Sequence, residues 1–199
     1  MDDPVHQKQP ILILEDNLVI FGPSGSGKSF ALLTLAKSIG LLYSPIEANI
    51  YCIDIGSQSP IKLLKECNMP HLPKDGGVIA GNDTERINRL FKMLRIELSE
   101  RADKLRLEGQ PSDIRLYNTN PNIPNKKKKP YIFIFIDGIS VQFNKDNMGF
   151  QDQLDFVVRR GPSLGIYVIL TGNIIRDIPD ILRTDIPSKL IFRSTDRDL

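Results

Sequence analysis

The chain has 199 residues, of which 41% are hydrophobic and 25% are charged, and its formal net charge is +2. These proportions are ordinary for a soluble globular domain and exclude a disordered or fibrous chain. A pI near 8.5 gives no sign of the clustered basic excess that nucleic-acid-binding domains usually carry.

The cysteines and the apolar runs exclude further classes of protein. Cys52 and Cys67 form no CxxC pair and have no matching histidines, so we expect neither a zinc site nor a disulfide framework. The apolar runs are shorter than the ~18 residues that would span a bilayer. We expect residues 1–199 to form a single domain, and the opening Met-Asp-Asp-Pro is typical of the cut edge of a larger multi-domain chain.

The first third of the chain alternates short apolar runs with turn residues. Residues 11–14 and 18–21 are apolar and are joined by Glu-Asp-Asn, which predicts an N-terminal β-hairpin. After a glycine-rich loop, residues 30–39 are apolar on all sides, which predicts a helix buried against a sheet. A strand is then predicted at residues 49–55, a short helix at 61–67 and a brief strand at 78–79.

A long amphipathic helix is predicted for residues 84–108, because apolar side chains recur there at helical spacing. They are Ile87, Leu90, Phe91, Leu94, Leu98, Ala102 and Leu105, with Asn82 and Glu85 as a capping box. Residues 112–130 lack periodicity, which predicts a variable surface loop. With further strands at 131–136, 165–170 and 189–192, the order predicts an α/β fold, a mostly parallel sheet sandwiched by helices.

The strongest motif matches GxxxxGK[ST] between a predicted strand and a predicted helix. It consists of Gly22, Pro23, Ser24, Gly25, Ser26, Gly27, Lys28 and Ser29. The glycines allow the backbone to wrap a phosphate with its N–H groups and the helix N-terminus. Lys28 is expected to reach the β- and γ-phosphates, and the Ser29 hydroxyl to hold Mg²⁺. The sequence therefore predicts a site for ATP with Mg²⁺.

A Walker B pattern follows in residues 131–137, an apolar run that ends at Asp137. We expect this carboxylate to act on the metal side of the phosphates. The next residue is Gly138, where most hydrolytic relatives of this type carry a glutamate that polarises the attacking water. Because glycine offers no proton acceptor, hydrolysis must use another carboxylate or be very slow.

Two other polar side chains are candidates for the same site. Asp54 ends the strand after the P-loop helix and is the available substitute base, the alternative being a structural role at the strand end. Asn173 follows the strand after the Walker B strand, where a group sensing the γ-phosphate would lie, the alternative being an ordinary turn residue. The four lysines at 126–129 favour a solvated loop over a contact with a phosphate backbone.

Several segments together resemble the FtsK/SpoIIIE family of P-loop motor domains. They are residues 49–56, 69–72, 77–80, 83–86, 131–138, 165–171 and 186–193. Within that family the set is similar to the tandem ATPase domains of the EccC/EssC proteins of type VII secretion, and the opening is most similar to the second of three. The resemblance implies a RecA/FtsK-like fold, nucleotide at residues 22–29, and Asn173 in place of a sensor glutamine.

Two departures from the family pattern suggest a degenerate catalytic site. Gly138 replaces the catalytic glutamate, and Pro162 stands where active members often carry an arginine that acts in trans on a neighbour's nucleotide. Arg159 and Arg160 are candidates to replace that arginine, or they offset a helix dipole. We therefore expect the nucleotide to be held more than turned over.

The resemblance also implies a cellular context. It suggests an ATP-binding module at the cytoplasmic face of the membrane, anchored only through other parts of the full-length protein. The expected partners are neighbouring ATPase domains of the same chain and small helical Esx-type secretion substrates, and oligomer formation is left open. Two rival hypotheses are an active FtsK-type DNA translocase, although DNA is a less expected partner, and a nucleotide-free structural scaffold.

Overall fold

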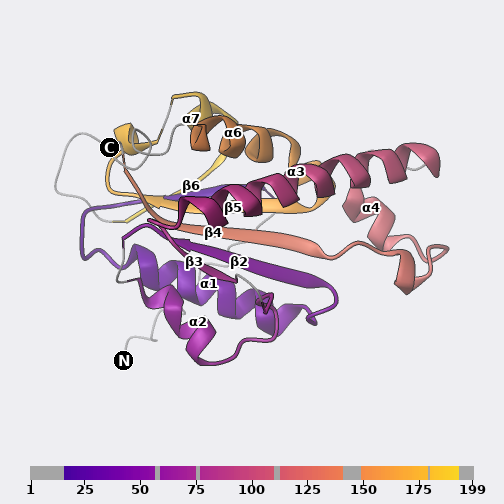
Figure 1. Cartoon of the computed structure of the whole chain (residues 1–199), viewed down its shortest axis with the longest axis horizontal. Coiled ribbons are helices and arrows are strands. Elements are labelled where there is room, and N and C mark those ends of the chain that lie inside the picture. The colour runs from indigo at the N-terminus through magenta and orange to yellow at the C-terminus, as the bar shows by residue number, and fades with distance from the viewer. Residues whose placement is uncertain are drawn as a thin grey trace, which may run out of the picture.

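The computed structural model describes residues 16–56, 59–74, 77–109, 113–140, 149–178 and 180–192. Its centre is a six-stranded sheet in the order β3-β2-β4-β5-β1-β6, in which every neighbouring pair is parallel (Figure 1). The strands are β1 (Leu18–Phe21), β2 (Ala48–Asp54), β3 (Val78–Ala80), β4 (Tyr131–Ile139), β5 (Ile166–Gly172) and β6 (Ser188–Ile191). The predicted parallel α/β sheet is confirmed.

Helices cover both faces of this sheet (Figure 1). They are α1 (Lys28–Leu42), α2 (Leu63–Glu66), α3 (Thr84–Leu107), α4 (Ile114–Thr119), α6 (Phe150–Arg160) and α7 (Asp180–Asp185). Short 3₁₀ turns lie between them: η1 (Pro60–Lys62), η2 (Asn125–Lys127), η3 (Pro162–Leu164) and η4 (Ile175–Asp177). In the part of the chain that the structure describes, no helix is long and apolar enough to cross a membrane.

Two hydrophobic cores result, one on each face of the sheet. On one face α1 packs with Leu32, Ala36 and Ile39 against alternate side chains of β1, β2, β4 and β5. On the other face α3, α6 and α7 cover the intervening side chains of the same strands. Successive side chains of a strand point to opposite faces of the sheet, so each residue of the central strands points toward one of the two cores.

Both edges of β1 carry parallel strands, β5 on one side and β6 on the other. Residues 11–14, the predicted hairpin partner, lie outside the described residues. The helix after the glycine-rich loop is less buried than predicted, since Phe30 is 64% exposed and Leu41 and Leu42 also face solvent. Its contact with the sheet occupies one side only, and an apolar residue does not by itself guarantee burial.

Residues 112–130 are not simply a loop, which corrects the prediction. They contain α4, whose Ile114 and Tyr117 are fully buried, and the 3₁₀ turn η2. A helix of six residues is too short to show periodicity in the sequence. Asp113 begins it, with a side-chain oxygen that accepts from the Arg115 N–H at 2.8 Å.

The long helix α3 is confirmed, but its contact stripe differs at one position. Arg101 is fully buried there, and Ala102, the residue predicted to face the sheet, is exposed. The guanidinium donates to the Glu97 carboxylate at 2.8 Å and to the carbonyls of Leu164 and Pro130, each at 2.7 Å. These three bonds explain how a cation is accommodated in the core. The helix cap is Asp83, whose carboxylate accepts from the Arg86 N–H, in place of the predicted capping box.

Candidate P-loop nucleotide site

The glycine-rich loop connects β1 to α1 at the carboxyl edge of the sheet. Gly25 and Gly27 have positive φ angles of 76° and 99°, which residues with a Cβ rarely adopt. A Cβ added at Gly22 would lie 2.7 Å from the Ser26 hydroxyl oxygen, so the backbone needs a glycine there. Among the described residues, the buried Ser26 hydroxyl oxygen has no hydrogen-bond partner. A tight glycine-rich turn at a helix N-terminus with an orphan polar atom fits a phosphate group.

Lys28 begins α1 and folds its side chain back over this loop. Its ammonium donates to the carbonyl of Gly22 at 2.7 Å and to that of Pro23 at 2.9 Å. Burial lowers the pKa of Lys28, and the negative charges of Asp137 and Asp177 act in the opposite direction. A buried cation with only carbonyl partners gains directly from a phosphate beside it. Ser29 follows on the first turn of α1 and is partly exposed, as its predicted role as a metal ligand requires.

Asp137 lies two residues before the end of β4 and is 4% exposed. One carboxylate oxygen accepts from the Thr171 hydroxyl at 2.6 Å, and that hydroxyl accepts from the Gly138 N–H at 2.8 Å. Thr171 is fully buried at the end of β5, the strand between β4 and the P-loop strand. The threonine therefore fixes the direction in which Asp137 points, a role that the sequence did not reveal.

Asp54 lies next to Asp137, because the two residues are register partners of β2 and β4. Within the described part of the chain, neither carboxylate oxygen has a hydrogen-bond partner, although the group is only 2% exposed. The Lys62 ammonium, which is half exposed, lies 3.5 Å away. Asp54 also lines a hollow of about 550 Å³ together with Lys62 and Arg86. The structure thus brings the two predicted carboxylates together, with Asp54 paired to a lysine.

The position after Asp137 has an unusual backbone. Gly138 has a φ of 90°, and the pairing of β4 with β5 shifts register between Ile136 and Ile139. A Cβ added at Gly138 would lie 3.2 Å from the Gly56 backbone nitrogen. The glycine therefore changes the path of the strand end as well as removing the proton acceptor.

Asn173 follows β5 and is exposed, and its backbone N–H donates to the Asp177 carboxylate at 2.8 Å. The same carboxylate oxygen accepts from the Ile174 N–H at 3.0 Å. Asp177 is nearly buried and acts electrostatically on Lys28, so it belongs to the site although sequence reasoning missed it. An aspartate that follows a strand end within about five residues is a turn-capping signal that could have indicated it.

Pro162, which takes the place of the trans-acting arginine, and its candidate replacements Arg159 and Arg160 lie away from the P-loop. Pro162 is in η3, directly before β5, so it lies at the amino edge of the parallel sheet, away from the P-loop. Arg159 pairs with the carboxylates of Asp155 and Asp185, each at 2.8 Å. Arg160 lies over the Phe156 ring at 5.0 Å. The structure brings none of the three to the glycine-rich loop of its own chain.

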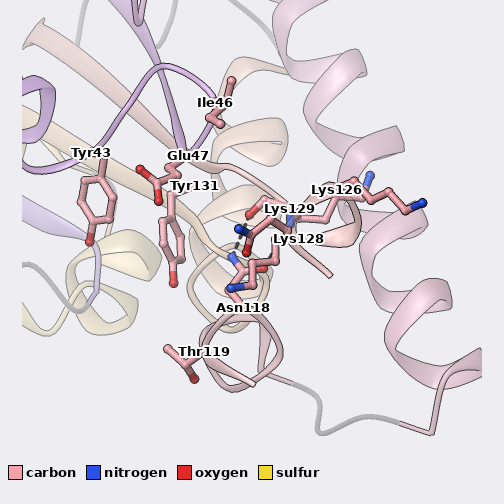
Figure 2. A pocket seen from close by; sticks show the side chains of 10 residues that line it. Tyr43, Ile46, Glu47, Asn118, Thr119, Lys126, Lys128, Lys129 and Tyr131 are labelled. Carbon is pink, nitrogen blue, oxygen red and sulfur yellow. Dashed lines mark hydrogen bonds between the residues drawn. The ribbon is translucent and has the colours of Figure 1, made fainter. Parts of the chain in front are cut away.

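The lysine run lies beside a hollow of about 700 Å³ at the amino edge (Figure 2). Tyr43 and Tyr131 stand on one side, with ring centroids 5.5 Å apart, and the labelled lysines lie on the other (Figure 2). The backbone of Lys129 exchanges two hydrogen bonds with the Asn118 side chain, and its ammonium lies 3.5 Å from Glu97. The run is therefore tied to α4 and α3 at one end; Lys126 and Lys127 are exposed, and Lys128 and Lys129 are partly buried.

The fold and this constellation define a P-loop ATPase of the RecA/FtsK type, and comparison with known proteins gives the family. Residues 2–183 match the model of the FtsK/SpoIIIE family, so the chain belongs to that family. The chain is 30% identical over 202 residues to the ESX secretion system protein YukB of Bacillus subtilis, covering 99% of this chain and 13% of YukB. It therefore spans only 12–13% of the length of the first curated relatives that it matches.

Solved structures give the same result. EssC (ATPases 2 and 3) from Geobacillus thermodenitrificans superposes with a TM-score of 0.79 at 26% identity, over 92% of this chain and 33% of that one. EccC (ATPases 2 and 3) of Thermomonospora curvata, in complex with a signal sequence peptide, superposes with a TM-score of 0.77 at 25% identity. The match covers 90% of this chain and 31% of that one. The predicted similarity to ATPase domains of EccC/EssC proteins is confirmed.

Proposed function

We propose that this domain binds ATP with Mg²⁺ in the loop of residues 22–29 and turns it over very slowly. The observation that supports binding is the buried ammonium of Lys28, which donates to the carbonyls of Gly22 and Pro23 and lies within electrostatic reach of Asp137 and Asp177. Ser29 and Asp137 are the residues that would hold Mg²⁺, which when bound neutralises phosphate charge. Thr171 holds the Asp137 carboxylate in place for that role.

Slow turnover follows from the side chains around the γ-phosphate position. Gly138 cannot accept a proton, and Asp54, the nearest alternative, has Lys62 3.5 Å from its carboxylate. Neither of the predicted candidates, Arg159 and Arg160, reaches this loop within the chain. General-base assistance is worth about 10²–10⁴-fold in rate and a trans arginine about 10³–10⁵-fold.

The test is a titration of ATP–Mg²⁺ into the isolated chain by calorimetry, with phosphate release measured in the same samples. We expect binding by the wild type and a loss of affinity of tenfold or more in Lys28→Ala, since a charge-assisted contact is worth ~1.5–3 kcal/mol. The matched control is Lys37→Ala, an exposed lysine on the same helix. Equal affinity of Lys28→Ala and wild type would refute the proposal, and stimulation of turnover by DNA would favour the translocase.

We propose further that the domain is one ATPase unit of a longer secretion protein at the cytoplasmic face of the membrane. Its partners are then adjacent ATPase domains and helical secretion substrates. The hollow at the amino edge supports this, because Tyr43, Tyr131 and the 86% exposed Ile46 offer apolar surface beside lysines. Type VII signal-sequence peptide should bind more weakly to Ile46→Asp than to wild type or to Ile96→Asp, the control on α3. Equal binding by all three would exclude this hollow.

A further inference from the structure

The carboxyl edge of the sheet is polar on one side of the P-loop and aromatic on the other. Along the strand order β2-β4-β5-β1-β6, the first three strands carry Asp54, Asp137 and Thr171 at or within two residues of their carboxyl ends. Beyond the P-loop strand, the chain leaves β6 at Phe192. The loop is therefore flanked by carboxylates toward β4 and by a single phenylalanine toward β6.

Phe192 is held firmly against the loop. Its backbone N–H donates to the carbonyl of Phe21 at 2.8 Å, which extends the β1–β6 pairing up to the first glycine. A Cβ added at Gly22 would lie 2.8 Å from the Cβ of Phe192, and one added at Gly27 would lie 3.7 Å from its ring carbon Cε1. The side chain thus reaches from the first glycine of the loop to the last.

The residue also keeps part of its surface exposed. Leu190 and Phe192 point to the α1 face and pack on that core, whereas Ile191 between them points the other way and is 55% exposed. Phe192 is only partly buried. A flat apolar surface therefore remains at the edge of a phosphate-binding loop.

The direction of a bound nucleotide follows from this arrangement and from the proposed function, on which the inference rests. The terminal phosphate has to point toward the metal-side carboxylate, Asp137 on β4. The nucleoside then extends to the opposite side of the loop, past β1 toward β6. We propose that Phe192 contacts the base or ribose of the nucleotide and contributes affinity that is independent of the phosphates.

An aromatic side chain suits that role chemically. Nucleobases stack on aromatic rings, and such contacts tolerate different bases because every base has a π-face. Phe192 should therefore strengthen the binding of ATP and GTP to similar extents. It should contribute nothing to the binding of an inorganic phosphate chain.

The test compares three ligands, ATP–Mg²⁺, GTP–Mg²⁺ and tripolyphosphate–Mg²⁺, by calorimetry on the full 199-residue chain. The variant is Phe192→Leu, which keeps an apolar side chain against Gly22 while removing the ring, and the control is Ile191→Ala on the other face. We expect Phe192→Leu to lose roughly five- to tenfold in affinity for both nucleotides and to keep its affinity for tripolyphosphate. Ile191→Ala should match the wild type with all three.

The other outcomes separate this inference from the proposed function. Equal losses for nucleotides and tripolyphosphate would overturn the inference, because Phe192 would then only support the loop. Unchanged affinity for all three ligands in Phe192→Leu would overturn it as well. A wild type that binds none of the ligands would instead refute the proposed function itself.

Discussion

Asp54 and Asp137 are register partners on β2 and β4, so two buried carboxylates lie side by side on the face of the sheet that α1 covers. Their partners differ. Asp137 accepts from the Thr171 hydroxyl, whereas the carboxylate of Asp54 lies 3.5 Å from the half-exposed Lys62 ammonium. The first arrangement holds the carboxylate that we propose as a metal ligand, and the second pairs the candidate base with a lysine.

Replacing Asp54 tests this division of roles. We expect the wild type to hydrolyse ATP at a barely detectable rate. Asp54→Asn should bind ATP with an affinity within about twofold of the wild type, because Asp54 is not proposed to contact the nucleotide. Phosphate release over hours, with calorimetry for affinity, measures both quantities. Brisk turnover by the wild type that disappears in Asp54→Asn without loss of affinity would identify Asp54 as the base and contradict the slow-turnover proposal.

Thr171 should act through Asp137. Thr171→Val removes the hydroxyl between Asp137 and the Gly138 N–H with little change in volume, and it takes away the partner of this partly buried N–H. We expect a loss of about 1–3 kcal/mol in the free energy of unfolding. We also expect the substitution to reduce ATP affinity, and the loss relative to the wild type should be larger in the presence of Mg²⁺ than in its absence. Thr171→Ser should restore both properties, and an undisturbed Mg²⁺ dependence in Thr171→Val would show that Asp137 needs no positioning.

Restoring a glutamate at position 138 should not restore catalysis. Gly138→Glu forces a side chain onto a φ of 90°, which costs about 1–2 kcal/mol, and it still leaves the site without a trans arginine. Gly138→Ala is the matched control, because it carries the same backbone strain without a carboxylate. Both variants should have a lower melting temperature and no measurable gain in phosphate release. A large gain in Gly138→Glu alone would show that the missing base was the sole defect.

The buried guanidinium of Arg101 should dominate the stability of the amino edge. Arg101→Met leaves the carbonyls of Leu164 and Pro130 without their donors in the core. We expect the free energy of unfolding in urea to fall by about 3–5 kcal/mol. Arg106→Met removes an exposed arginine from the same helix and should change it by less than about 1 kcal/mol. Similar values for the two variants would contradict the structural role of Arg101.

Alkaline stability should report on Tyr167. Burial raises the pKa of Tyr167 to about 12, from an ordinary value of 10.0. Between these two pH values the unfolded chain releases this proton and the folded chain keeps it, so the free energy of unfolding falls as the pH rises. The loss from this residue reaches about 2–3 kcal/mol near the upper limit. Tyr167→Phe should show a shallower decline above pH 10 in urea unfolding, and parallel curves would contradict the assignment.

Much of the fold could be predicted from the sequence, and so could the P-loop and the Asp137 carboxylate of the candidate site. The P-loop and Asp137 were found because each combines a local motif with an apolar run. Thr171 and Asp177 could not be assigned their roles, because those roles depend on which strands are neighbours, and strand order is not encoded in local periodicity. The φ of Gly138 was equally hidden, since a glycine in a strand is compatible with many conformations. Arg101 was missed because a buried cation breaks the apolar pattern that defines a helix face.

The strand β4 carries the two regions of interest at its two ends. Tyr131 borders the hollow at the amino edge, and Asp137 lies at the P-loop, about 20 Å further along at 3.3 Å per residue. Between them Phe133 and Phe135 point to the same face and are buried against α1. The ring of Phe133 also packs against the rings of Tyr43 and Tyr167. The core beneath β4 therefore connects the proposed nucleotide site at one edge with the proposed protein-binding hollow at the other, and Phe133→Ala would disturb this connection.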